Sequence, residues 1–211
     1  MVGILIALQI QNWNQQRLDR IEERYLLEEL VDNLNQEAER LEFGIELQGK
    51  QLQDFGEIRE YFGGKSANED EFQNKLAWLI AIFGFNPVSS AYDTMKGGGI
   101  GFSSRELKAE LVQYYEVEQA LLIGTLSRQE GIISQQVEPL FAKYVKFLDY
   151  GNDSGPRAIP KNIDDRIFQE AILGQIVLLA PNVNLARERS KTLMEKNREI
   201  LALVEQELEG M

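Results

Sequence analysis

The chain has 211 residues, a formal net charge of −12 at pH 7, and neither cysteine nor histidine. These absences exclude disulfides, thiolate nucleophiles, Cys- or His-ligated zinc and histidine-based catalytic triads. The acidic balance argues against nucleic acid as a partner, because a negatively charged surface repels phosphate backbones.

The N-terminal stretch from Val2 to Ile10 is apolar apart from Gln9, and no charged residue precedes Arg17. These nine residues would rise roughly 14 Å as a helix, whereas the hydrocarbon core of a bilayer is about 30 Å thick, so the stretch alone cannot span. A tryptophan followed by arginines is typical of a membrane–water boundary. We therefore interpret residues 1–16 as the C-terminal part of a transmembrane helix with its interfacial collar, the alternative being an ordinary buried helix start. The predicted membrane-interface residues are Ile4, Leu5, Ile6, Leu8, Ile10, Trp13 and Arg17.

One long helix is predicted from Arg17 to about Phe62. Steps of 3.5 residues on average from Leu27 define eleven positions. They are Leu27, Val31, Leu34, Ala38, Leu41, Ile45, Gln48, Leu52, Phe55, Arg59 and Phe62. Nine of the eleven are apolar, and the exceptions are Gln48 and Arg59. A stripe this narrow is typical of a coiled-coil or bundle seam. We favour an intramolecular bundle core, because the later helices need a partner face, and keep an intermolecular coiled coil as the alternative. Residues 17–211 are predicted to form a single all-α domain, an elongated antiparallel helical bundle.

A polar loop at 63–68 separates this helix from a second one, predicted from Glu69 to Phe83. The centre of the second helix is apolar on all sides but too short to cross a bilayer, so we expect it to be the most buried helix of the bundle. A short helix is expected over Ser90–Lys96. The glycine-rich run 97–101 lacks the residue order of a phosphate-binding loop and has no strand before it, which favours a flexible turn over nucleotide binding.

Ser103 and Glu106 have the spacing of a capping box and predict the start of another long helix, which kinks or restarts at Pro139. The stretch 149–156 is rich in turn residues, and its oxygens do not follow the ligand spacing of an EF-hand calcium loop. Two further helices are expected, at 160–179 and 183–209, with a break at the intervening Ala-Pro-Asn. No alternation typical of β-strands occurs over a useful length.

Four residues are candidates for lining a binding cleft. They are the paired Tyr114 and Tyr115, together with Tyr92 and Lys96. The alternative is that the tyrosines belong to the core and have their hydroxyl groups satisfied at the surface, which is the commoner use of such residues.

Two motifs carry a resemblance to a known family. The first, GILIALQIQNWNQQR at the N-terminus, looks like the end of the single transmembrane helix of an uncharacterised family of bacterial membrane proteins, known only as a domain of unknown function. The second comprises Ser90-Ala91-Tyr92-Asp93-Thr94-Met95-Lys96-Gly97-Gly98, Arg105-Glu106-Leu107 and Tyr114-Tyr115-Glu116. The chain departs from the family in lacking the upstream half of the helix and in carrying glycine at 97–99 and 101. The first departure predicts that Met1 is internal to a longer gene product or is a late start.

The resemblance implies basic residues upstream of Met1, and hence a bundle on the periplasmic side of the bacterial inner membrane. The three arginines after Trp13, taken alone, indicate the opposite orientation with a cytoplasmic bundle, which stays open as the alternative. The family supplies no activity and no catalytic residues. We therefore expect a membrane-tethered bundle that acts by binding, as a scaffold, partner subunit or ligand sensor, without a cofactor or catalytic activity. Its expected partners are the bilayer and a protein or a second copy of the chain. The alternatives are a soluble cytoplasmic interaction domain and an enzyme built on a pair of carboxylates.

Overall fold

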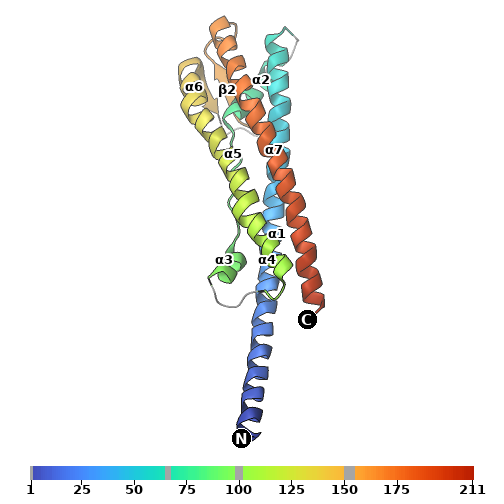
Figure 1. The fold of residues 1–211 in the computed structure, drawn as a ribbon. Coiled ribbons are helices and arrows are strands. Elements are labelled where there is room, and N and C mark those ends of the chain that lie inside the picture. Colours follow the sequence, from blue (N-terminus) through green and yellow to red (C-terminus); the bar gives the residue numbers. More distant parts are fainter. Residues whose placement is uncertain (1, 65–67, 98–101, 150–154) are drawn as a thin grey trace. The chain divides into compact units, whose positions relative to one another are not determined.

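The computed structural model describes residues 2–64, 68–97, 102–149 and 155–211, and its fold is all-α with one short hairpin (Figure 1). The all-α prediction is confirmed, including the long N-terminal helix. In chain order the elements are α1 Val2–Phe62, α2 Glu69–Ala77, η1 Trp78–Ile80, α3 Ser90–Lys96, α4 Arg105–Val112, η2 Gln113–Glu118, α5 Gln119–Ile132, η3 Ile133–Val137, α6 Glu138–Tyr144, β1 Val145–Asp149, β2 Arg157–Pro160 and α7 Arg166–Glu209. Most of the predicted glycine-rich turn and the centre of the 149–156 loop lie outside the described residues.

The chain divides into two compact units, which are described separately below. Unit 1 comprises Met1–Arg40, Asn86–Gln119 and Thr192–Met211. Unit 2 comprises Leu41–Phe85 and Ala120–Lys191. Both α1 and α7 contribute residues to each unit.

The prediction of a transmembrane helix is wrong for the described residues. None of their helices combines the length and the apolar character that a bilayer crossing requires. In α1 the apolar run ends at Ile10, and an amide-rich stretch and then Arg17 follow it. The hydrophobic stretch is therefore too short, as its nine residues already indicated.

The structure describes the side chains of five of the seven predicted membrane-interface residues. The side chains of Ile4 and Leu5 lie outside the described residues. The others are exposed on α1: Ile6, Leu8, Ile10, Trp13 and Arg17. The alternative of an ordinary buried helix start therefore does not hold for those five side chains.

The buried side of α1 differs from the predicted seam at every second position. The predicted positions that are buried are Leu27, Leu34, Leu41, Gln48 and Phe55. The buried positions between them come one residue earlier than predicted, at Leu30, Glu37, Gly44, Gln51 and Ile58. The predicted positions and the buried positions both repeat every 3.5 residues on average, so periodicity alone does not distinguish them. The buried positions include polar residues and a glycine, so a search for apolar residues does not select them.

The core of unit 2 is built around aromatic rings from three helices. The Tyr61 and Phe72 rings stack with centroids 4.1 Å apart, and the Phe62 ring lies edge-on to both Phe72 and Phe168. The second helix ends earlier than predicted, at Ala77, and η1 follows it. Gln51 Nε2 donates to the carbonyl oxygens of Trp78 and Ala81, at 3.2 and 2.8 Å, and so satisfies acceptors that a helix end leaves free.

A two-stranded antiparallel sheet, β1 with β2, was not expected from the sequence. Its contacts to α2 explain why such short strands form. The Arg157 guanidinium bonds to Asp70 and to Gln73 Oε1, and Asn74 Nδ2 donates to the carbonyl oxygen of Pro156 at 2.8 Å. A hairpin alone is marginally stable, and packing against a helix supplies the remaining stabilisation.

The predicted helix break at residues 180–182 is wrong, and the helix begins at Arg166 rather than at residue 160. α7 runs from Arg166 to Glu209 without a break at Pro181. Leu179 and Val183 on either side of the proline are fully buried, and Asn182 Nδ2 donates to the carbonyl oxygen of Leu178 at 2.8 Å, so packing and a side-chain bond offset part of the cost of the proline.

The cap of α4 lies one residue later than predicted. Ser104 Oγ accepts from the Leu107 N–H, whereas Ser103 Oγ donates to Glu23 Oε2 at 2.7 Å. Beyond α4 the backbone stays helical as far as Tyr144, through the two π-helical segments η2 and η3. Pro139 is the second residue of α6, directly after η3, and the backbone stays helical across it.

Candidate functional site

The structure brings together the four predicted cleft residues, all in unit 1. α3 carries Tyr92 and Lys96, and η2 carries Tyr114 and Tyr115. The Tyr92 and Tyr115 rings stack with centroids 4.6 Å apart, and the Tyr114 ring meets the Tyr115 ring edge-on at 4.9 Å. All three rings are buried, which matches the alternative of core tyrosines, and ligand binding at this position stays a prediction.

Glu116 on η2 connects the tyrosines to Lys96. Tyr92 Oη donates to Glu116 Oε1 at 2.9 Å, and Lys96 Nζ lies 2.6 Å from the same oxygen. Burial and this hydrogen bond raise the pKa of Tyr92 to about 12, and the hydrogen bond from Lys96 holds the pKa of Glu116 below its usual value. At neutral pH Tyr92 is therefore a hydroxyl donor and Glu116 an ionised acceptor.

A fully buried carboxyl group, Glu37 on α1, lies at the centre of a second polar cluster in the same unit. It accepts hydrogen bonds from the Val88 N–H at 2.7 Å, from Tyr114 Oη at 2.7 Å and from Gln119 Nε2 at 3.0 and 3.1 Å. The donors come from three places, namely the segment before α3, the π-helix η2 and the first residue of α5.

Asn197 extends this cluster to α7. Its Nδ2 atom donates to Tyr114 Oη and to the carbonyl oxygen of Leu34, each at 3.0 Å. Because Asn197 donates to Tyr114, the Tyr114 hydroxyl is free to donate to Glu37, so the direction of the chain of hydrogen bonds is fixed. We refer to Glu37, Val88, Tyr114, Gln119 and Asn197 as the Glu37 cluster.

The electrostatics of the Glu37 cluster favour a structural role. Burial raises the pKa of Glu37, and the hydrogen bonds from Tyr114, Val88 and Gln119 counteract this effect. Burial and the neighbouring Glu37 likewise raise the pKa of Tyr114. The carboxyl group is enclosed by its donors, so the cluster holds five segments of unit 1 in one arrangement.

Sequence reasoning missed Glu37, Gln119 and Asn197. A signal existed for Glu37, because it follows Leu34 by three residues and precedes Leu41 by four, which places it on the same side of a helix as both leucines. The neighbouring Ala38 is apolar and fits the same average spacing, so the hydrophobic pattern favours Ala38 over Glu37. No comparable sequence signal marks Gln119 or Asn197, since their partners are distant in the chain.

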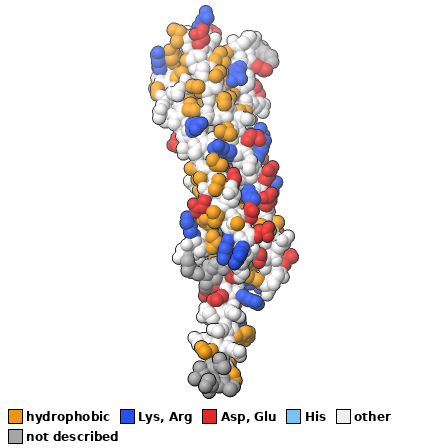
Figure 2. Space-filling model, in the orientation of Figure 1, with side chains coloured by type: hydrophobic (Ala, Val, Ile, Leu, Met, Phe, Trp, Pro, Cys, Tyr) orange, Lys and Arg blue, Asp and Glu red, His pale blue; other side chains and the backbone are white. Residues whose placement is uncertain are grey.

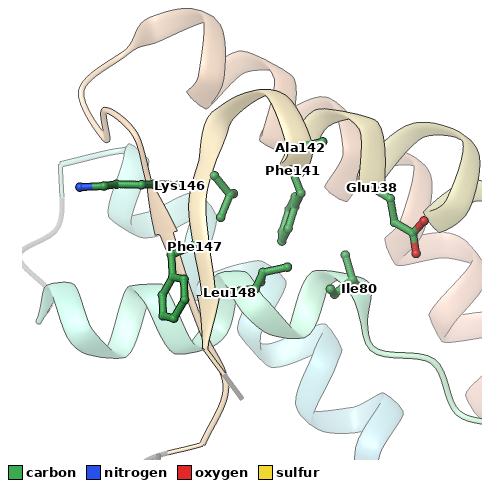
Figure 3. A pocket seen from close by; sticks show the side chains of 8 residues that line it. Ile80, Glu138, Phe141, Ala142, Lys146, Phe147 and Leu148 are labelled. Atoms are coloured by element: carbon green, nitrogen blue, oxygen red, sulfur yellow. The ribbon is translucent and has the colours of Figure 1, made fainter. Parts of the chain in front are cut away.

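Unit 2 contains a pocket of about 420 Å³ beside the hairpin (Figure 3). Its lining is mostly apolar and comes from η1, α6 and β1: Ile80, Glu138, Phe141, Ala142, Val145, Lys146, Phe147 and Leu148. Figure 3 shows Phe141 and Leu148 side by side, with Glu138 at one end and the Lys146 side chain directed away from the cavity.

A second pocket in this unit, of about 280 Å³, is lined by Arg128, Arg189 and their neighbours on α5 and α7. Arg189 Nη1 already bonds to the carbonyl oxygen of Leu121 and to Thr125 Oγ1.

The N-terminal part of α1 is not covered by other described residues. Every side chain from Leu8 to Glu22 is exposed, and Glu23 is the first that is buried. Hydrophobic side chains are visible on this end of the helix in Figure 2. The exposed large apolar residues are Ile6, Leu8, Ile10, Trp13, Leu18, Ile21 and Tyr25. We call these seven residues the α1 stripe.

The described residues contain no group of three or more acidic side chains that could hold a metal ion. Comparison of the chain with protein-family models, curated proteins and solved structures found no match. The resemblance inferred from the two sequence motifs therefore stays a prediction.

Proposed function

We propose that this chain acts by binding, and that the α1 stripe docks onto a helical segment of a protein partner. The observation that carries the proposal is the uncovered run from Leu8 to Glu22. Helices in proteins gain most of their stability by packing an apolar face, and a helix of this length alone in water is marginal. A partner that covers the stripe would supply the missing packing.

The geometry of the stripe supports one continuous contact surface. With about 100° per residue, all of the stripe except Leu8 falls within roughly 140° of the helix circumference. The buried positions that follow, Glu23, Leu27 and Leu30, project from the opposite side of the helix. The stripe therefore faces away from the rest of unit 1, where a partner can reach it.

The charges on the same side of the helix indicate the chemistry of the partner. Arg17 follows Trp13 by four residues, and Arg20 and Arg24 follow at further steps of three and four, so the arginines continue along the same side of the helix. Arg24 pairs with Glu28 at 3.0 Å. A helix with an apolar stripe flanked by carboxylates complements this surface. A second copy of the chain would bring the same three arginines to the contact.

Photo-crosslinking in the source cell tests this proposal. A benzoylphenylalanine at Trp13 should give one discrete adduct with another protein, and the same group at Asn12 should not, because Asn12 projects from the opposite side of the helix. Ile10→Asp should abolish the Trp13 adduct. Equal adducts at the two positions, or adducts that contain only lipid or a second copy of the chain, would contradict the proposal.

The proposal does not depend on a membrane. Attachment to a bilayer, and location on the periplasmic side of the inner membrane, stay predictions of the sequence. The carboxylate-based enzyme also stays a prediction. Support for such an enzyme would require two facing carboxylates with raised pKa values. Burial raises the pKa values of Glu37 in unit 1 and of Asp54 in unit 2. The hydrogen-bond partners of Glu37 are Val88, Tyr114 and Gln119, and that of Asp54 is Lys50.

A further inference from the structure

The smaller pocket of unit 2, of about 280 Å³, is lined by two positive charges and by no negative one. The helices α5 and α7, which lie side by side in Figure 1, supply its lining: Ala120, Leu121, Gly124, Thr125, Arg128, Leu185 and Arg189. All seven residues belong to unit 2, so the pocket is independent of the α1 stripe. The chain as a whole has 34 acidic and 22 basic residues, so the charge of this lining is opposite to that of the protein.

Arg189 on α7 is half-buried, and its guanidinium group is held by neutral acceptors. Its Nη1 atom donates to the carbonyl oxygen of Leu121 and to Thr125 Oγ1. These bonds orient the group without neutralising its charge, and arginine has further donors on Nε and Nη2. The adjacent Glu188 pairs with Lys191 at 2.8 Å and does not line the pocket. Because a partly desolvated charge without a counter-ion is unfavourable, an anion in the pocket would stabilise Arg189.

Arg128 supplies the second positive charge, from α5. It follows Leu121 and Gly124 by seven and four residues, which places all three on one side of the helix. Arg128 is exposed, and the ion pairs among the described residues involve other arginines, such as Arg157 and Arg166. A guanidinium group binds carboxylate or phosphate oxygens through two parallel N–H donors, so two such groups at one pocket favour an oxyanion.

The rest of the lining limits the size and polarity of a ligand. Leu121 and Leu185 supply apolar surface from the two helices. A Cβ atom built at Gly124 would meet nothing within 4 Å, so the space above this part of α5 is open. The volume of about 280 Å³ is just below the usual range of ligand sites, roughly 300–1,000 Å³, and suits a small molecule.

We propose that this pocket binds a small organic anion. Its carboxylate or phosphate group lies between Arg128 and Arg189, and its compact apolar part contacts Leu121 and Leu185. The guanidinium groups select for negative charge and fix the orientation of the ligand, and the leucines favour a molecule with an apolar body over an inorganic ion.

Titration of the full chain with benzoate tests the charge requirement, with the arginine side-chain Nε–H signals followed by NMR. Benzoate should shift the signals of Arg128 and Arg189 with saturation in the millimolar range, and its neutral isostere benzamide should not. Arg128→Gln should weaken benzoate binding by about tenfold, because it removes a charge-assisted contact. Arg59→Gln is the matched control, since Arg59 is also exposed in unit 2 and does not line the pocket, and it should leave the affinity within about twofold.

A second pair of variants separates a pocket from mere attraction to surface arginines. Gly124→Leu fills the pocket without removing a charge, and Gly131→Leu lies two turns further along α5, outside the lining. A Cβ atom at either glycine meets nothing within 4 Å, so both variants should fold and keep the melting temperature. Only Gly124→Leu should abolish binding. Phenyl phosphate in place of benzoate shows whether a phosphate or a carboxylate binds more tightly.

Four results would overturn the proposal. They are equal binding of benzamide and benzoate, equal losses in Arg128→Gln and Arg59→Gln, unchanged binding in a folded Gly124→Leu chain, and no saturation at about 50 mM of either benzoate or phenyl phosphate.

Discussion

The replacement of Gly44 on α1 by alanine tests the packing of unit 2 most sharply. A Cβ atom at this position would lie 2.4 Å from Cζ of Phe83 and 2.5 Å from its Cε1. Phe83 is only 4% exposed and cannot swing into solvent. Overpacking of this kind costs about 1–3 kcal/mol. The higher helix propensity of alanine returns about 0.5–1 kcal/mol, so Gly44→Ala should lower the free energy of unfolding by about 0–2.5 kcal/mol.

Gly56 provides the matched control on the same helix. Nothing lies within 4 Å of a Cβ atom built there, so Gly56→Ala should stabilise the chain by about 0.5–1 kcal/mol. The difference between the two variants isolates the contact with Phe83. Urea unfolding followed by circular dichroism measures it, and Phe83→Leu should recover most of the loss in the Gly44→Ala background. If Gly44→Ala were as stabilising as Gly56→Ala, the close approach of α1 to Phe83 would be refuted.

The remaining predictions concern the Glu37 cluster and α7. Because the folded-state pKa of Glu37 is raised above 4.5, ionisation of this group costs stability as the pH rises through 4.5 and on to the raised pKa. Glu37→Gln should remove that part of the pH dependence, which unfolding titrations across the range measure, and an unchanged profile would show that Glu37 is not buried. Tyr114→Phe should destabilise the chain by about 1–3 kcal/mol in chemical unfolding, because it removes one hydrogen bond from each of two buried partners, Glu37 and Asn197. Tyr115→Phe, which loses a single 3.2 Å bond to Val88, should cost less, and equal costs would contradict the cluster. Pro181→Ala should raise the melting temperature, with a gain of up to about 3 kcal/mol, whereas a loss would show that the proline is needed where it lies.

Helical periodicity was enough to predict the all-α fold and the long first helix, but it did not determine which side of that helix is buried. Val31 and Ala38 are apolar and fit the average spacing, yet Leu30 and Glu37 are the buried residues. Apolar preference selects the wrong neighbour when a core position is polar, because the hydrogen bonds that make Glu37 tolerable come from Val88, Tyr114 and Gln119, far away in the chain.

The hairpin and the unbroken α7 were missed for a related reason. The strands of the hairpin are short, and contacts of Arg157 and Asn74 stabilise them rather than any alternation within β1. Pro181 is a strong local signal for a helix end, and burial of Leu179 and Val183 outweighs it. The four cleft candidates stand out in the sequence because they are aromatic or charged. The alternative stated for the tyrosines, that they belong to the core, matches the burial of Tyr92, Tyr114 and Tyr115.

Amide hydrogen exchange across α1 is the most direct test of the central claim that its N-terminal part is a binding surface. In the chain alone, Leu8–Glu22 should exchange much faster than Leu26–Arg40, because no side chain covers the first segment. In the presence of the partner identified by crosslinking at Trp13, the first segment should become protected while the second changes little. Equal protection of both segments in the isolated chain, or no added protection when the partner binds, would contradict the account.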